Sequence, residues 1–117
     1  MPAAPQTSFA FHSPLPTNDL AALLRSGEIP LADYLAELAE RFTAVEPHIQ
    51  AFVPEDGRFD RLYRDAQNLL ATYPDPATRP SLFGLPVGVK DIFHVAGFTT
   101  RAGCQLPTNL LQGAEAE

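Results

Sequence analysis

The stretch Gly84–Gly103 reads GLPVGVKDIFHVAGFTTRAG, and the interpretation of the whole chain depends on it. It combines a short apolar run with four glycines and with Lys90, which is the only lysine among the eight basic residues of the chain. The apolar run Val87–Ile92 predicts a strand that is buried on both faces. Because side chains alternate across a strand, we expect Lys90 and Asp91 to point to opposite faces.

Three helices are predicted before this stretch from the spacing of their apolar residues. The first is short, capped by Thr17 or Asn18 and closed by Gly27. The second is expected over Leu31–Val45, with Pro30 at its first position and an end just before Pro47, and the third over about Arg58–Thr72. A second, shorter strand is predicted over Ile49–Val53. Helices and strands together indicate an α/β fold.

The predicted strands lack partners in this sequence. Two strands are marginal in water, and the backbone groups of a buried strand must be hydrogen-bonded. We therefore expect the missing strands beyond residue 117; the alternative is that they come from another subunit. The tail Gly113–Glu117 has the acidic residues of a helix N-terminus and predicts the first turn of a further helix. Residues 1–16, with four prolines and no charge, predict an extended arm.

Composition narrows the class of protein. The chain has 117 residues, a formal net charge of −6 and 45% hydrophobic residues, which is typical of a globular chain. An acidic surface argues against nucleic acid and anionic membranes as partners. Apolar runs are too short for a membrane helix, and no signal peptide is visible, so a cytoplasmic protein is expected. The single cysteine, Cys104, excludes an internal disulfide.

The pattern Gly84-x-Pro86-x-x-Val89-Lys90-Asp91, followed by Gly97-x-Thr99-Thr100-x-x-Gly103, resembles the start of the catalytic core of the amidase signature family. The upstream helical sequence from about Leu20 is also similar to that family. The resemblance implies an α/β fold in which N-terminal helices precede a mixed sheet covered by helices, and it assigns residues 17–117 to the first part of an amidase domain. It implies a small-molecule amide as substrate, with no cofactor and no metal.

The family's chemistry implies a role for Lys90. These enzymes use a serine nucleophile, a second serine held by a cis peptide bond, and a lysine that takes the proton. A lysine acts as a base only when neutral, and lowering its reference pKa of about 10.4 by about 3 costs roughly 4 kcal/mol. Burial of Lys90 on its strand would favour the neutral form. The motif implies support of the site by the following residues: Asp91, Gly84, Pro86, Gly97, Thr100 and Gly103.

The other catalytic groups of the family are absent from this sequence. Its serines, Ser8, Ser13, Ser26 and Ser81, lie in no Gly/Ser-rich segment, so we expect the chain alone to be inactive. Cys104 replaces a serine that is frequent in the family, and without a neighbouring base it is not expected to be a nucleophile. The three histidines show no metal-ligand spacing.

Three alternatives stay open from the sequence. On spacing alone, Lys90 is most simply a strand-end lysine whose ammonium reaches solvent. The chain could also be a non-catalytic remnant or interaction module. Finally, the same family includes subunits of tRNA-dependent amidotransferases, so either amidotransferase partner subunits or a homo-oligomer is compatible with the sequence.

Overall fold

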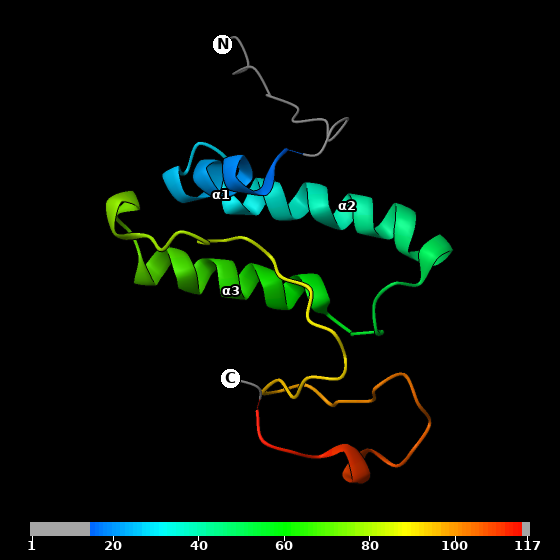
Figure 1. Ribbon diagram of the computed structural model, residues 1–117. Helices are drawn as coiled ribbons and strands as arrows, with labels where there is room; N and C mark the ends of the chain where they lie inside the picture. Colours follow the sequence, from blue (N-terminus) through cyan, green and yellow to red (C-terminus); the bar gives the residue numbers. More distant parts are fainter. Residues whose placement is uncertain (1–14, 116–117) are drawn as a thin grey trace.

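The computed structural model describes residues 15–115, which contain helices and loops but no β-strand (Figure 1). Helix α1 spans Thr17–Ser26, α2 spans Leu31–Ile49 and α3 spans Arg58–Thr72. Two short 3₁₀ helices follow, η1 over Pro76–Thr78 and η2 over Thr108–Leu111. The predicted α/β fold is therefore seen here only in its helical part. The extended arm predicted for residues 1–16 lies almost wholly outside the described residues.

The starts of α1 and α2 differ in detail from the sequence prediction. Pro16 and Pro30 occupy the N-cap positions, and neither helix has a side-chain cap, so Thr17 is the first helical residue and not a cap. The end of α1 is as predicted, because Gly27 adopts the left-handed conformation with φ of 80° and its N–H donates to Leu24 O. A residue with a Cβ atom is strained in this conformation, whereas glycine adopts it without that cost.

Helix α2 runs past Pro47 to Ile49, four residues beyond the predicted end at Val45. A proline removes one backbone donor and crowds the preceding turn, which usually ends a helix. Here Glu46 secures the additional turn, since its carbonyl accepts from Gln50 N–H and its carboxylate accepts from Phe52 N–H at 2.8 Å. The same bonds overturn the predicted strand over Ile49–Val53, whose backbone is used to close the helix.

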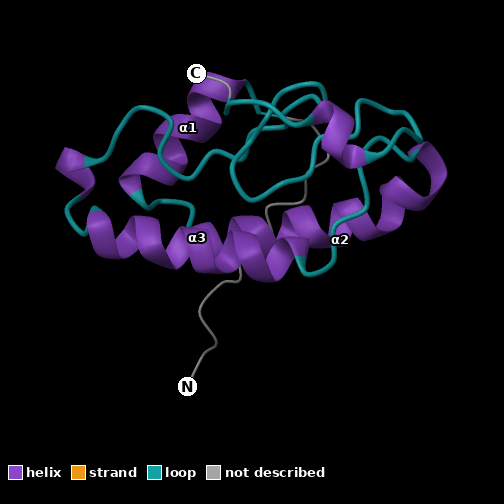
Figure 2. Cartoon of the chain, turned by 90° about the horizontal axis from the view of Figure 1, so that it is seen from below, coloured by secondary structure: helices purple, strands orange, loops and turns teal. Residues whose placement is uncertain are grey.

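Helices α2 and α3 pack side by side, and α1 contacts η1 (Figures 1 and 2). The core between them is apolar and includes Phe83, which comes from the loop after α3 and is only 1% exposed. Its ring meets Tyr73 edge to face, with 6.3 Å between ring centroids. The buried cluster consists of Leu24, Ile29, Leu31, Tyr34, Leu35, Ala66 and Phe83. We call residues 15–85, which enclose this core, the helical unit.

Arg79 fastens the ends of two helices together. Its guanidinium donates to Arg25 O at the end of α1 and to Tyr73 O at the end of α3, both at 3.0 Å. The same group lies over the Phe83 ring, 4.5 Å from the centroid. Carbonyl groups at helix ends lack partners within the helix, so a guanidinium with several donors satisfies them well. Arg79 thus holds the loop that carries Phe83 against α1 and α3.

Residues 86–115, which we call the motif segment, leave the helical unit and form a loop with little core of its own (Figure 1). The predicted buried strand Val87–Ile92 is wrong for this part of the chain, because Val87 and Val89 are 72% and 57% exposed. Residues 15–115 contain no neighbouring strand that could cover them. The predicted helical turn at Gly113–Glu117 is not seen over 113–115, and its last two residues lie outside the described range.

Candidate functional site

Lys90 lies in the loop that follows the Leu82–Leu85 turn, and its side chain is exposed. Its carbonyl accepts from Phe93 N–H at 3.1 Å, so the chain turns directly after it. No ion pair to Lys90 is found in residues 15–115. The burial expected for Lys90 is therefore not provided by the described part of the chain, and the ammonium reaches solvent, which was the simplest of the alternatives.

Gly84 attaches the start of the motif to the helical unit. The turn Leu82–Leu85 is closed by a 3.1 Å hydrogen bond from Leu85 N–H to Leu82 O, and Gly84 has a φ of +73°. A Cβ at Gly84 would lie 2.2 Å from Leu31 Cδ2, at the buried start of α2. Only glycine fits both the conformation and the space. Pro86, half-buried, follows and leads the backbone away from the core.

Asp91 makes the hydrogen bonds to the following loop that the sequence led us to expect. Its carboxylate accepts from Arg101 N–H at 3.2 and 3.3 Å, and its carbonyl accepts from Ala102 N–H at 2.9 Å. The next turn, Arg101–Cys104, has positive φ at both central residues, Ala102 and Gly103. A tight reversal of this kind favours glycine, which explains the glycine at 103. Asp91 is thus tied to residues 101 and 102 although about ten positions separate them.

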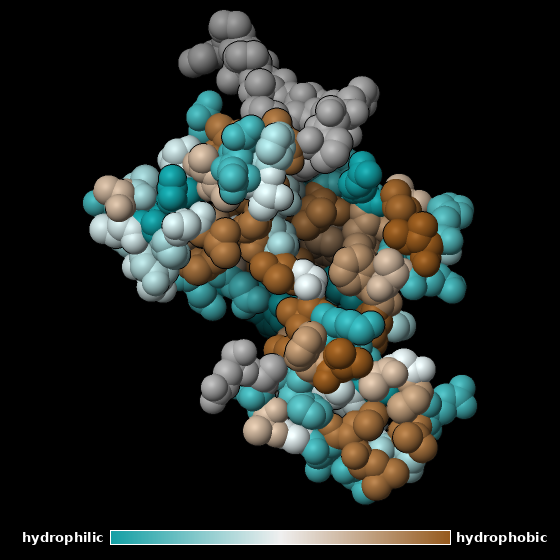
Figure 3. All heavy atoms as spheres, in the orientation of Figure 1, coloured by the Kyte–Doolittle hydropathy of each residue, from teal (hydrophilic) through white to brown (hydrophobic). Residues whose placement is uncertain are grey.

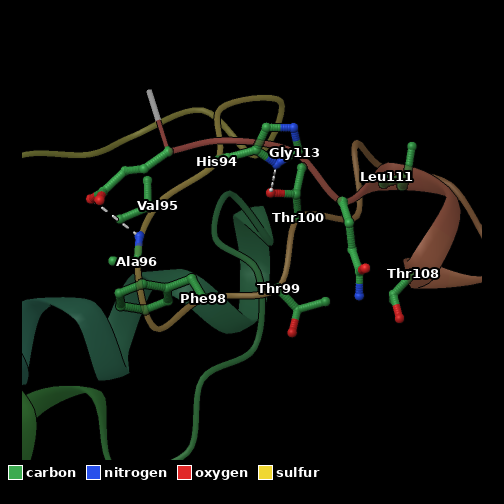
Figure 4. A pocket seen from close by; sticks show the side chains of 11 residues that line it. His94, Val95, Ala96, Phe98, Thr99, Thr100, Thr108, Leu111 and Gly113 are labelled. Atoms are coloured by element: carbon green, nitrogen blue, oxygen red, sulfur yellow. Dashed lines mark hydrogen bonds between the residues drawn. The ribbon is translucent and has the colours of Figure 1, made fainter. Parts of the chain in front are cut away.

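Gly97 and Thr100 shape the loop between these two anchors. Gly97, with φ of +81°, lies in a turn closed by Phe98 N–H donating to Val95 O. Thr100 Oγ1 lies 2.9 Å from His94 Nδ1 (Figure 4), and it donates to Phe93 O at 3.3 Å. If the hydroxyl proton goes to Phe93 O, the Nδ1–H of His94 donates to Thr100. The glycines and the threonine of the predicted site therefore each have an observed role in the loop.

A hollow of about 510 Å³ lies beside this loop (Figure 4). Its polar side chains include those of His94, Thr99 and Thr100, and Glu115 closes one side by accepting from Ala96 N–H at 3.4 Å. The remaining lining residues are Val95, Ala96, Phe98, Thr108, Leu111, Gln112 and Gly113. Lys90 does not line the hollow, so this space and the candidate base are separate in the described part of the chain.

The site also depends on residues that the sequence analysis did not single out. Glu55 accepts from Arg61 Nε at 2.6 Å and from Arg58 Nε at 3.2 Å. The Arg61 hydrogen bond lowers the pKa of Glu55, and the same bond raises the pKa of Arg61. Arg61 also lies over the ring of Phe98, 5.1 Å from its centroid, and so links α3 to the motif segment. The position of the two arginines shortly after Glu55 was the available sequence signal.

The remaining candidates for chemistry make local contacts. Cys104 is a free, half-buried thiol whose Sγ donates to Arg101 O at 3.0 Å. Within residues 15–115, no three histidine, cysteine or carboxylate side chains are close enough to hold a metal ion. Across the same range, no helix has the length and apolar character needed to cross a membrane.

These features define a helical unit that presents a glycine-rich motif around a single lysine. The chain belongs to the amidase family, whose model, described as Amidase, matches residues 33–117. This match confirms the resemblance noted in the sequence, and it includes the motif from Gly84 to Gly103.

Similar curated proteins share one name, that of the A subunit of glutamyl-tRNA(Gln) amidotransferase. The protein of that name from Roseiflexus sp. (strain RS-1) is 30% identical over 95 residues, covering 81% of this chain and 19% of the relative. The one from Bacillus velezensis is 29% identical over 91 residues, covering 78% of this chain and 18% of the relative. The chain thus spans about a fifth of the length of these relatives. No solved structure matches the chain.

Proposed function

We propose that this chain supplies the lysine base of an enzyme that cleaves the carbon–nitrogen bond of an amide. The observation that carries the proposal is that the family match includes Lys90 within its Gly84-x-Pro86-x-x-Val89-Lys90-Asp91 context. In this mechanism Lys90 accepts the proton of a serine nucleophile through a second serine held by a cis peptide bond. Both serines belong to sequence outside these 117 residues, so the chain alone is inactive.

Residues on either side of Lys90 hold the backbone of the motif in place. Asp91 binds the backbone of Arg101 and Ala102, and Gly84 fixes the motif against α2. Lys90 therefore extends between two anchored points, one on each side in the sequence. A residue held in this way loses less conformational freedom when it is positioned for catalysis. Pro86, Gly97, Thr100 and Gly103 act as structural support for the same loop.

Lys90 needs a covered environment before it can act as a base. A neutral lysine at neutral pH requires removal from water, because burial disfavours the charged form. The side chain is exposed in the described residues, so in the proposed mechanism its cover comes from outside residues 15–115. The substrate is a small-molecule amide that binds in the assembled enzyme.

The test replaces Lys90 in the protein expressed from its complete coding region. Lys90→Ala should lower the rate of ammonia release from amides by at least 100-fold, since a positioned general base contributes about 10²- to 10⁴-fold. Lys90→Arg should be as inactive, because a guanidinium keeps the charge but does not deprotonate. Arg64→Ala, an exposed charge removal on α3, is the matched control. Activity within tenfold of the unaltered protein in Lys90→Ala would exclude the proposed role.

A second candidate function is that of an amidotransferase subunit. The specific observation in its favour is the name shared by the similar proteins, which are all A subunits of glutamyl-tRNA(Gln) amidotransferase. It requires partner subunits and an ammonia donor, whereas a free-standing amidase requires neither. An assay that follows amide transfer to glutamyl-tRNA(Gln) beside simple ammonia release separates the two functions. Absence of both activities in the protein from the complete coding region would favour a non-catalytic interaction module.

A further inference from the structure

The motif segment meets the helical unit over a narrow waist. Figure 3 shows it as a lower lobe, which lies below α3 in the ribbon view of Figure 1. The stretch that leads from Gly84 into this lobe is weakly held, since Val87 and Val89 are 72% and 57% exposed. The position of Lys90 relative to the helices therefore depends on contacts made further along the lobe.

Lys90 belongs to the loop that follows it. Its carbonyl accepts from Phe93 N–H at 3.1 Å, so its backbone is part of the first turn of that loop. The next residue, Asp91, closes the loop through its hydrogen bonds to the N–H groups of Arg101 and Ala102. A contact that holds this closed loop in place thus restrains the backbone of Lys90 as well.

Phe98 is the residue of this loop that contacts α3. Its N–H donates to Val95 O at 3.1 Å, so the side chain extends from a hydrogen-bonded turn. The guanidinium carbon of Arg61 lies 5.1 Å from the centroid of its ring. A guanidinium within about 6 Å of an aromatic ring is attracted to the face of that ring. This contact joins the loop to the helical unit.

The guanidinium of Arg61 is oriented by carboxylates of the helical unit. Its Nε and Nη2 donate to the two oxygens of Glu55 at 2.6 and 3.2 Å, and its Nη1 donates to Asp65 at 3.3 Å. Glu55 is itself held by Arg58, whose Nε donates to it at 3.2 Å. A planar guanidinium bound through a fork of this kind keeps one orientation. Its face is thereby set in place for Phe98.

We propose that Arg61 is a positioning residue for Lys90: by holding Phe98, it fixes the loop that includes the lysine against α3. This inference rests on the proposed function, in which Lys90 is the base of amide cleavage. It adds a residue that lies outside the Gly84–Gly103 motif and outside the lining of the hollow. Arg61 acts through the loop and not by contact with the lysine or with the substrate.

This role differs from a contribution to the core. Within residues 15–115, the buried cluster contains neither Arg61 nor Phe98, and these side chains are 33% and 49% exposed. Loss of their contact therefore leaves the core packed and changes the placement of the loop. A displacement of about 1 Å at a catalytic group can lower a rate about 100-fold. Because the lysine acts in the chemical step, the loss should appear in kcat and not in KM.

The kinetic test uses the protein expressed from its complete coding region. Arg61→Ala should lower kcat for ammonia release from amides by about 5- to 50-fold and leave KM unchanged within about twofold. Arg64→Ala, which removes an exposed arginine of the same helix, is the matched control and should leave both constants unchanged. Equal kcat values in the two variants would overturn the proposal.

Variants of Phe98 test the same contact from the side of the loop. Phe98→Leu, at an exposed position that the core does not use, should lower kcat as Arg61→Ala does. Phe98→Tyr keeps the aromatic face and should retain kcat within about twofold. If the two residues act through one contact, Arg61→Ala combined with Phe98→Leu should lose no more than the larger single loss. Losses that multiply in the double variant would contradict the pairing.

A measurement that does not depend on activity separates this proposal from the proposed function. With para-fluorophenylalanine at position 98, Arg61→Ala should shift and narrow the fluorine NMR resonance, because the ring loses its contact and gains mobility. An unchanged resonance would overturn the positioning role of Arg61. Lys90→Ala should leave the resonance unchanged, so its rate judges the proposed function while the resonance in Arg61→Ala judges whether Arg61 holds the loop.

Discussion

The helical unit buries its apolar side chains, whereas the motif segment exposes most of its own. Between the helices, Leu24 and Phe83 are each 1% exposed, whereas Val87 and Leu110 in the motif segment are 72% and 65% exposed. A helix satisfies its own backbone hydrogen bonds and needs only an apolar neighbour. A strand needs a neighbour for its backbone as well. The described part of the chain therefore contains the partners for its helices and lacks those for its predicted strand.

The largest expected effect comes from opening the core of the helical unit. Phe83→Ala removes a fully buried ring and should lower the free energy of unfolding by about 3–5 kcal/mol, measured by urea denaturation followed by circular dichroism. Phe93→Ala, at a position 51% exposed in the motif segment, should cost less than about 1 kcal/mol. Equal losses in the two variants would break the distinction between the two regions.

A smaller effect is expected where the two regions join. Gly84→Ala introduces a Cβ toward Leu31 at a φ of +73°, and should lower the free energy of unfolding by about 2–3 kcal/mol. Gly88→Ala, with open space and no positive φ, should change it by less than about 0.5 kcal/mol in the isolated chain. The same urea titration checks both. A cost at Gly88 equal to that at Gly84 would mean that residues 87–89 are already packed.

The smallest effect concerns an ion pair within the helical unit, between Glu55 and Arg61. The pKa of Glu55 is lowered in the folded chain by the hydrogen bond from Arg61, so its stabilisation is complete above the ordinary carboxyl pKa of about 4.5. That stabilisation is lost as the pH falls through the lower, folded-state pKa. Glu55→Gln should therefore cost about 1 kcal/mol or less at pH 7, since the pair is partly solvated, and nothing at low pH.

Thermal unfolding of the wild-type chain and Glu55→Gln between about pH 2 and pH 7 measures this difference. The two curves should converge at acidic pH. Curves that stay parallel across the whole range would contradict the assigned role of Glu55. Glu40→Gln, an exposed carboxylate of α2 with no ion pair in residues 15–115, is the matched control.

The helices could be predicted from the sequence because their signals are local. The leucine stripe of α2 and the bounds of α3, Arg58–Thr72, follow from spacing, and Gly27 marks the end of α1. The extension past Pro47 could not be predicted in this way. It depends on two hydrogen bonds that Glu46 accepts, from Gln50 N–H and from Phe52 N–H. The spacing of apolar residues carries no information about these bonds.

The local hydrogen bonds of Asp91 agree with the sequence analysis, whereas the environment of Lys90 does not. The motif pointed to Asp91 as a loop anchor, and its bonds to Arg101 are present. The burial of Lys90 was predicted from apolar neighbours, but burial depends on partners that residues 15–115 do not contain. Arg61 and Phe98 meet only because α3 and the motif segment approach one another in three dimensions, so their contact had no sequence signal.

The hydrogen bonds of Arg79 have a consequence for cooperativity. The guanidinium joins Arg25 and Tyr73, and the contact to Arg25 spans 54 positions of sequence. If the last turn of either helix frays, the guanidinium loses an acceptor, and the loop that carries Phe83 loses an attachment. Fraying at one helix end is thereby coupled to fraying at the other. A single side chain from the loop after α3 thus links the stability of the last turn of α1 to that of the last turn of α3.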